Sequence, residues 1–313
     1  MGRSGTIVHY NGAAWSVMTS GTANDLEGVW GSSGTDVYAV GLSGTILRYD
    51  GTRWRVASGV TTRWLRAVWG SSPSDVYAAG SEGEIVRYNG SAWSRMSSST
   101  KQTLYGVWGS GNGDVFAAGE SGLVLRRHDG GAWVPIAGFL RPPVFNAVWS
   151  SGDGETFAAG GYEYSGFYPL HGPIWRWDGG AWSESTLTTS FLYSLWGASG
   201  DDIFAGGNGG TILHYDGVEW SVMTDGDVLE WHGLWGSSGT DVFAVGGYFY
   251  LDGDIRTRNV ILHYDGSAWR QMTSPGTAEP ILNGVWGSSP YEVFAAGGWQ
   301  YQGADQHTIC RDN

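Results

Sequence analysis

Two short patterns of apolar and polar residues alternate along the chain. The first pattern reads LEGVWGSSGTDVYAVG at Leu26–Gly41, LRAVWGSSPSDVYAAG at Leu65–Gly80 and WHGLWGSSGTDVFAVG at Trp231–Gly246. The second reads TIVHYNGAAW at Thr6–Trp15, TILRYDGTRW at Thr45–Trp54 and TILHYDGVEW at Thr211–Trp220. Short stretches of this kind, bounded by Asp-Gly and Asn-Gly turns, are typical of β-strands, and no helical period of 3.6 residues appears.

Each pattern occurs seven times. The tryptophan of the first pattern recurs as Trp30, Trp69, Trp108, Trp149, Trp196, Trp235 and Trp286. That of the second recurs as Trp15, Trp54, Trp93, Trp133, Trp182, Trp220 and Trp269. A period of about 40 residues with four short strands per unit is typical of a propeller blade. We therefore predict an all-β protein with one domain over residues 1–313, a seven-bladed β-propeller with four antiparallel strands, a to d, in each blade.

The two ends of the chain are predicted to share the seventh blade. Gly2–Thr6 matches Gly41–Thr45, so the chain starts in the turn between strands b and c. The N-terminal residues then supply strands c and d, and Leu282–Gly297 supplies strands a and b. The segment His307–Asn313 also resembles a strand c, but Asp312 falls where the repeat has Tyr, and burying a charge is costly. We expect residues 5–10 to occupy this position.

Three columns of the repeat have structural explanations. A small column on strand a allows seven inner strands to converge on one axis, and comprises Gly28, Ala67, Gly106, Ala147, Ser194, Gly233 and Gly284. An acidic column is interpreted as turn residues that accept bonds from backbone N–H groups, and comprises Asp36, Asp75, Asp114, Glu155, Asp202, Asp241 and Glu292. A basic column on strand c is interpreted as packing and hydrogen bonding between blades, with contact to a ligand as the alternative, and comprises His9, Arg48, Arg87, Arg127, Arg176, His214 and His263.

Composition and charge exclude several classes. Gly is 53 of 313 residues, but the 19 Trp and the absence of a G-X-Y period exclude a disordered or collagenous chain. A formal charge of −13 argues against nucleic acid as a partner, because binding it requires a basic face. No apolar run is long enough to insert into a membrane. The single cysteine, Cys310, excludes an internal disulfide. We expect a monomer, and we favour an extracellular or cell-surface location.

The motif VWGSSxxDV[YF]A[AV]G followed by TILHYDGxxW resembles a family of bacterial Trp- and Gly-rich β-propeller repeat proteins. The spacing of its repeats is loosely similar to that of the tectonin-type propeller lectins. The motif covers nearly the whole chain and departs from WD40 and kelch repeats. The resemblance implies a propeller fold and assigns no catalytic residues.

One column on strand a varies where its neighbours are nearly fixed. It lies three residues before the first tryptophan and comprises Glu27, Arg66, Tyr105, Asn146, Tyr193, His232 and Asn283. This position is expected near the mouth of the central channel, where such a mixture suits a single asymmetric pocket. Drift at a solvated rim is the alternative. If the pocket is catalytic, His232 and either Tyr105 or Tyr193 would serve as base and acid, with Glu27 beside them and Arg66 holding an anionic group.

Aromatic residues mark the same face. The b–c loops at 160–173, 246–259 and 297–306 are predicted to be long and carry Tyr162, Tyr164, Tyr248, Tyr250, Trp299 and Tyr301. Trp64 and Trp299 belong to neither tryptophan column, so they are the best candidates for stacking on a ligand. Hydrophobic lids folded over one another are the alternative reading.

Metal and catalytic motifs are weak. Asp225-Gly226-Asp227 with Glu230 and His232, and Asp252-Gly253-Asp254, are the richest acidic stretches, but neither completes a calcium loop. We therefore expect no metal and no cofactor, with calcium as the open alternative. No GxSxG, P-loop, HExxH or paired-cysteine pattern is present.

The sequence favours a non-catalytic, lectin-like module. Its ligand would be a carbohydrate or another cell-surface ligand, bound on the face of the long b–c loops. The expected contacts are the aromatic residues above together with Asn146 and Asn283. One alternative is a polysaccharide lyase or hydrolase that uses the polar residues at the channel mouth. The second is a protein-interaction platform.

Overall fold

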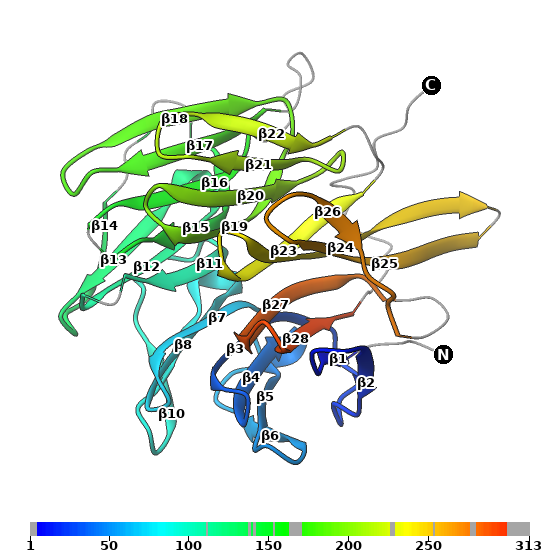
Figure 1. The fold of residues 1–313 in the computed structure, drawn as a ribbon. Helices are drawn as coiled ribbons and strands as arrows, with labels where there is room; N and C mark the ends of the chain where they lie inside the picture. The colour runs from blue at the N-terminus through cyan, green and yellow to red at the C-terminus, as the bar shows by residue number, and fades with distance from the viewer. Residues whose placement is uncertain are drawn as a thin grey trace.

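The computed structural model describes residues 5–298, apart from 111, 137, 138, 140, 141, 153, 163–170, 226–228, 253 and 276–279. Of residues 248–252 and 254–257 it describes the backbone alone. These residues form seven four-stranded antiparallel sheets arranged as the blades of a propeller, which confirms the predicted fold (Figure 1).

In each blade the four strands a to d lie side by side in this order, with strand a nearest the central axis and strand d on the outside. Blades 1 to 3 comprise β3 (Leu26–Ser33), β4 (Asp36–Gly41), β5 (Ile46–Tyr49), β6 (Trp54–Ser58), β7 (Leu65–Ser72), β8 (Asp75–Gly80), β9 (Ile85–Tyr88), β10 (Trp93–Met96), β11 (Leu104–Gly109), β12 (Asp114–Gly119), β13 (Val124–His128) and β14 (Trp133–Pro135). Blades 4 and 5 comprise β15 (Val144–Ser150), β16 (Thr156–Gly161), β17 (Gly172–Trp177), β18 (Trp182–Thr188), β19 (Leu192–Ser199), β20 (Asp202–Gly207), β21 (Ile212–Tyr215) and β22 (Trp220–Thr224). Blades 6 and 7 comprise β23 (Glu230–Ser238), β24 (Asp241–Asp252), β25 (Asp254–Tyr264), β26 (Trp269–Gln271), β27 (Leu282–Ser289), β28 (Glu292–Gly297), β1 (Thr6–Tyr10) and β2 (Trp15–Met18). Three 3₁₀ turns, η1 (Leu42–Gly44), η2 (Ser81–Gly83) and η3 (Glu120–Gly122), join strands b and c of blades 1 to 3.

The seventh blade closes as predicted. Its sheet has the order β2-β1-β28-β27, with Ile7 opposite Ala296 and Tyr10 opposite Val293 (Figure 1). Strand β27 packs against β3 of the first blade, which completes the ring. The competing segment His307–Asn313 lies outside the described residues. The N-terminal strands therefore cover an edge that would otherwise be open to pairing with another chain.

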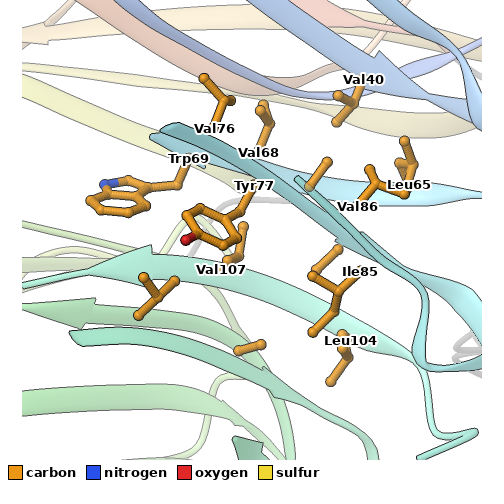
Figure 2. Close-up of a cluster of buried hydrophobic side chains, with 14 of the residues drawn as sticks. Val40, Leu65, Val68, Trp69, Val76, Tyr77, Ile85, Val86, Leu104 and Val107 are labelled. Atoms are coloured by element: carbon orange, nitrogen blue, oxygen red, sulfur yellow. The ribbon is translucent and has the colours of Figure 1, made fainter. Parts of the chain in front are cut away.

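The core lies between successive blades. Figure 2 shows Trp69 of β7 beside Tyr77 of β8, in a cluster that also contains Val68 and reaches Val40 of the first blade and Val107 of the third. At six of the seven junctions, the first tryptophan of one blade packs over the glycine that follows the first tryptophan of the next blade. A Cβ on Gly70 would lie 2.5 Å from Trp30, and one on Gly31 would lie 2.7 Å from Trp286. The inner strands also approach backbone to backbone at the small column, where a Cβ on Gly28 would meet Ala67 and Val68.

Each residue of the acidic column pairs with a base on strand c of its own blade. Arg48 Nε donates to Asp36 Oδ1 at 2.6 Å, and His263 Nε2 lies 2.6 Å from Asp241 Oδ1. The equivalent pairs are Arg87–Asp75, Arg126–Asp114, Arg176–Glu155, His214–Asp202 and His9–Glu292. The interpretation of the acids as backbone acceptors was therefore wrong. Strand c places a base opposite the aromatic residue two positions after each acid, as Arg48 lies opposite Tyr38, and from there the base reaches the carboxylate.

Blade 3 departs from the predicted basic column. The residue opposite Phe116 is Arg126, not Arg127, because the turn after His128 is one residue longer than in the other blades. Arg127 is instead buried between blades, where it donates to the Tyr77 hydroxyl at 2.8 Å.

The segment 246–259 was predicted to be a long loop but forms a β-hairpin. Its residues extend β24 and β25 into a hairpin whose register runs from Gly247–Asn259 to Asp252–Asp254. The hairpin reaches beyond the other strands of the ring (Figure 1).

Candidate functional site

A β-bulge brings the variable column to the mouth of the channel. In each blade the pairing of strands a and b skips one residue, as between Leu26 and Gly28 or between Trp231 and Gly233. The skipped residue is the variable one in all seven blades. A bulge turns the extra side chain away from the sheet. The preceding residue is buried throughout, whereas all seven variable side chains keep a half-buried surface. The mouth is therefore lined by seven side chains of five residue types on one rigid frame.

The two asparagines tie neighbouring blades together. Asn146 Nδ2 donates to the Leu192 carbonyl at 2.8 Å, from blade 4 to blade 5. Asn283 Nδ2 donates to the Leu26 carbonyl at 3.0 Å, from blade 7 to blade 1. Both amides thus have a role in holding the rim, beside the ligand contacts that we predicted for them.

Blades 2 and 3 form one wall of the mouth. The Arg66 guanidinium carbon lies 3.2 Å from the centre of the Trp64 ring and 5.5 Å from that of Tyr105. Trp64 was predicted to stack on a ligand, and it holds Arg66 in a cation–π contact. The Tyr105 hydroxyl donates to Glu120 Oε1 at 3.3 Å. Because stacking engages the face of the guanidinium, its N–H donors lie around the edge of the plane.

Glu27 lies beside this wall and is shielded from bulk water. Desolvation raises its pKa to about 6, and the nearby negative charge of Asp25 acts in the same direction. The charges of Arg66 and His232, and the Trp64 indole, oppose that shift. Although some of the Glu27 surface is exposed in the channel, protein atoms surround the carboxylate closely enough for burial to dominate. Glu27 of blade 1 therefore interacts with bases from blades 2 and 6 across the mouth.

Blades 5 and 6 form the opposite wall. The rings of Tyr193 and His232 stack with centroids 5.0 Å apart and planes 29° apart, and Phe191 lies 5.5 Å from Tyr193. His232 Nε2 lies 3.3 Å from Glu230 Oε2. The structure thus brings together five predicted residues, Glu27, Arg66, Tyr105, Tyr193 and His232, and fixes the planes of Arg66 and His232.

Sequence analysis missed the partners that support these walls. Trp64, Phe191 and Glu230 occupy one column, two residues before the bulge, whose other members are Asp25, Thr103, Val144 and Ile281. This column lies at the first residue of strand a or just before it, beside the bulged residue. The signal was a second variable column next to the first. Of its members, Trp64 was predicted only to stack on a ligand and Glu230 was named only in a candidate metal stretch.

Most of the aromatic loop residues fall outside what the structure describes. Tyr164, Trp299 and Tyr301 are outside the described residues, and only the backbone of Tyr248 and Tyr250 is described. Tyr162 follows β16, and its backbone N–H donates to the His171 carbonyl at 3.0 Å. Their predicted role in stacking on a ligand stays a prediction.

The acidic stretches are only partly described. Asp227 and the side chains of Asp252 and Asp254 lie outside what is described, whereas Asp225, Glu230 and His232 lie within it. Among described side chains, no three His, Cys, Asp or Glu residues are grouped so as to hold a metal ion. No helix in the described part of the chain has the length and apolar character needed to cross a membrane.

Solved propellers resemble this chain in fold. No protein-family model and no curated protein matches it. A structure of YCF48 bound to D1 peptide is 17% identical with a TM-score of 0.64, over 88% of this chain and 89% of that chain. YCF48 from Cyanidioschyzon merolae is 14% identical with a TM-score of 0.65, over 91% and 99%. The WD40 propeller domain of Doa1 is 12% identical with a TM-score of 0.66, over 93% and 94%. At such identities the likeness shows the fold alone.

Proposed function

We propose that this chain is a non-catalytic binding propeller that holds an extended peptide of a partner protein across the channel mouth lined by the variable column. The observation that carries this proposal is the pair of opposing walls, one built on Arg66 and Trp64 and the other on Tyr193 and His232. In each wall an aromatic ring stacks against a nitrogen-bearing group, which fixes the orientation of that group. The Trp64 ring holds the Arg66 guanidinium, and the Tyr193 ring holds the His232 imidazole. Rigid groups of this kind lower the entropy that binding costs.

A peptide fits the mixed chemistry of this mouth. Its backbone offers a donor and an acceptor at every residue. The Arg66 guanidinium donates to carbonyl or carboxylate oxygens, whereas Glu27 accepts from N–H groups. Tyr105 and Tyr193 add the amphipathic surface on which peptide side chains pack. The YCF48 structure with D1 peptide supports the proposal, because a propeller of the same fold is there bound to a peptide.

The other functions have less support from the described residues. Carbohydrate binding on this face was predicted from Trp64, two asparagines and the aromatic residues of the long loops, and most of those loop side chains lie outside the described residues. The lyase or hydrolase reading retains the contact of His232 with Glu230 at 3.3 Å. Production of an unsaturated sugar from an acidic polysaccharide would favour that enzyme and overturn our proposal.

Selection of linear peptides from a displayed random library tests the proposal. The full chain is the target, and the selected peptide is then titrated against the R66A/H232A double variant. We expect its affinity to fall at least about tenfold, which corresponds to ~1.4 kcal/mol.

The matched control is Arg55→Ala, which removes an exposed arginine that pairs with Asp50 on the outer edge of blade 1. It should leave binding unchanged. Failure to select any peptide, or equal binding by the double variant, would contradict the proposal.

A further inference from the structure

One position on the outer strands is apolar in six blades and polar in the seventh. It is the third residue after the second tryptophan, and comprises Met18, Ala57, Met96, Ile136, Ser185, Met223 and Met272. Every methionine of the chain except Met1 falls in this column. Ser185 of blade 4 is its only polar member.

The apolar members cover the tryptophan of the next blade. Each of them lies in the same hydrophobic cluster as that tryptophan, as Met223 does with Trp269 and Met18 with Trp54. The Trp15 indole N–H even donates to Met272 Sδ at 3.4 Å. Between blades 4 and 5 the residue in this column is Ser185, whose side chain is shorter than methionine. The Trp220 indole N–H donates to its Oγ at 3.0 Å. Because a serine is much smaller than a methionine, the space beyond its hydroxyl is left open.

A groove of about 440 Å³ lies at this junction. Blade 4 contributes Ser183, Glu184, Ser185 and Thr186, and blade 5 contributes Glu219 and Trp220. The volume is within the range of ordinary ligand pockets, ~300–1,000 Å³. The groove lies on the outer strands, whereas the peptide site proposed above lies on the inner strands at the channel mouth.

We propose that this groove binds a neutral saccharide. Hydroxyl and carboxylate side chains in a row match the alternating donors and acceptors of a sugar, and the Trp220 indole supplies an apolar border for its C–H groups. Arg176, which also lines the groove, is held by an ion pair with Glu155, so the groove presents no unneutralised cation for an anionic ligand.

Addition of a peptide strand at this edge is disfavoured. Strand β18 pairs with β17 through Thr186–Ile174 and Glu184–Trp175, which leaves Ser185 as a bulge. A bulge interrupts the row of backbone groups that an added strand would need. Peptide binding in the groove is therefore an outcome that would overturn the assignment.

The test is a panel of neutral disaccharides, comprising maltose, cellobiose, lactose and diacetylchitobiose, measured by ligand-observed NMR at millimolar concentration. We expect at least one to bind the full chain. Ser185→Met restores the side chain used by four other blades, so it should fill the groove and weaken binding at least about tenfold. Its melting temperature shows whether it folds, and Glu219→Gln, at the exposed rim, gives a second variant that should weaken binding.

Ala57→Met is the matched control, because it makes the same kind of change in blade 1. It should leave saccharide binding intact, and S185M should bind the selected peptide as the wild type does, which separates this site from the channel mouth. The proposal is overturned if no disaccharide binds, if S185M binds as well as wild type, or if A57M loses binding equally.

Discussion

The guanidinium of Arg66 lies over the ring of Trp64, with its central carbon 3.2 Å from the ring centre. Trp64 immediately precedes β7 and Arg66 is its second residue, so the two residues lie on either side of the buried Leu65 in the sequence. Arg66 is the bulged residue, so the contact depends on a local irregularity that all seven blades share. It converts a long flexible side chain into a fixed planar donor at the rim of the channel.

Arg66→Lys should separate charge from planarity. Lysine keeps the positive charge but loses the flat face and the fork of N–H donors. We expect the affinity for the selected peptide to fall about tenfold, with an unchanged melting temperature. Arg48→Lys, in the acid–base pair with Asp36 of blade 1, is the control and should bind normally. Normal binding by R66K would show that the stacked geometry does not matter.

Glu27→Gln should stabilise the protein in a pH-dependent manner. The pKa of Glu27 is about 6 in the folded state and 4.5 ordinarily, so the folded state holds this proton more tightly. Ionisation therefore lowers the free energy of unfolding as pH rises through this window, and glutamine avoids that loss. The variant should gain up to ~2 kcal/mol above the window and nothing below it.

Urea unfolding of both proteins across this pH range measures that difference. A constant difference at all pH values would mean that Glu27 titrates normally in the folded protein. Glu219→Gln, at an exposed carboxylate, is the control and should show no such dependence.

Gly70→Ala should destabilise the contact between blades 1 and 2. The new Cβ would lie 2.5 Å from Trp30 and 2.9 Å from the Asp75 carbonyl oxygen, and the backbone cannot move away freely. We expect a loss of about 1–3 kcal/mol in the free energy of unfolding, as for other overpacked cores. Gly59→Ala is the control, since nothing lies within 4 Å of its Cβ. Equal stability of both variants in denaturant would refute the interlocking of tryptophan and glycine.

Removal of residues 1–20 should open the ring. It deletes β1 and β2 and leaves the edge of β28 unpaired between Val293 and Gly297. Buried Ile7, Val8 and Trp15 are lost as well. We expect a large fall in melting temperature and association through the exposed edge, seen by light scattering. Removal of residues 307–313 should change the melting temperature little. A large fall in this second variant would contradict the side-chain argument that assigned strand c of blade 7 to the N-terminal residues.

The repeat in the sequence determined the blades, because each copy carries its own turn residues and its own alternation of apolar positions. Seven tryptophans in each of two columns specified seven units, and the mismatch of Asp312 with the Tyr column pointed to β1 for the last blade. These are local properties, since a strand and its hairpin turn are specified by residues that are close in sequence. The variable column was visible for the same reason.

Only the tertiary structure decided which side chains meet across the ring. Glu27 and His232 are far apart in sequence, yet the ring brings them close enough for the His232 charge to act on the Glu27 pKa. The pairing of each acid with a base on strand c depended on register, which placed Arg126 and not Arg127 opposite Phe116. The opening beside Ser185 likewise arises from two outer strands of different blades. Contacts between blades depend on how the sheets are arranged around the axis, and no single repeat contains that information.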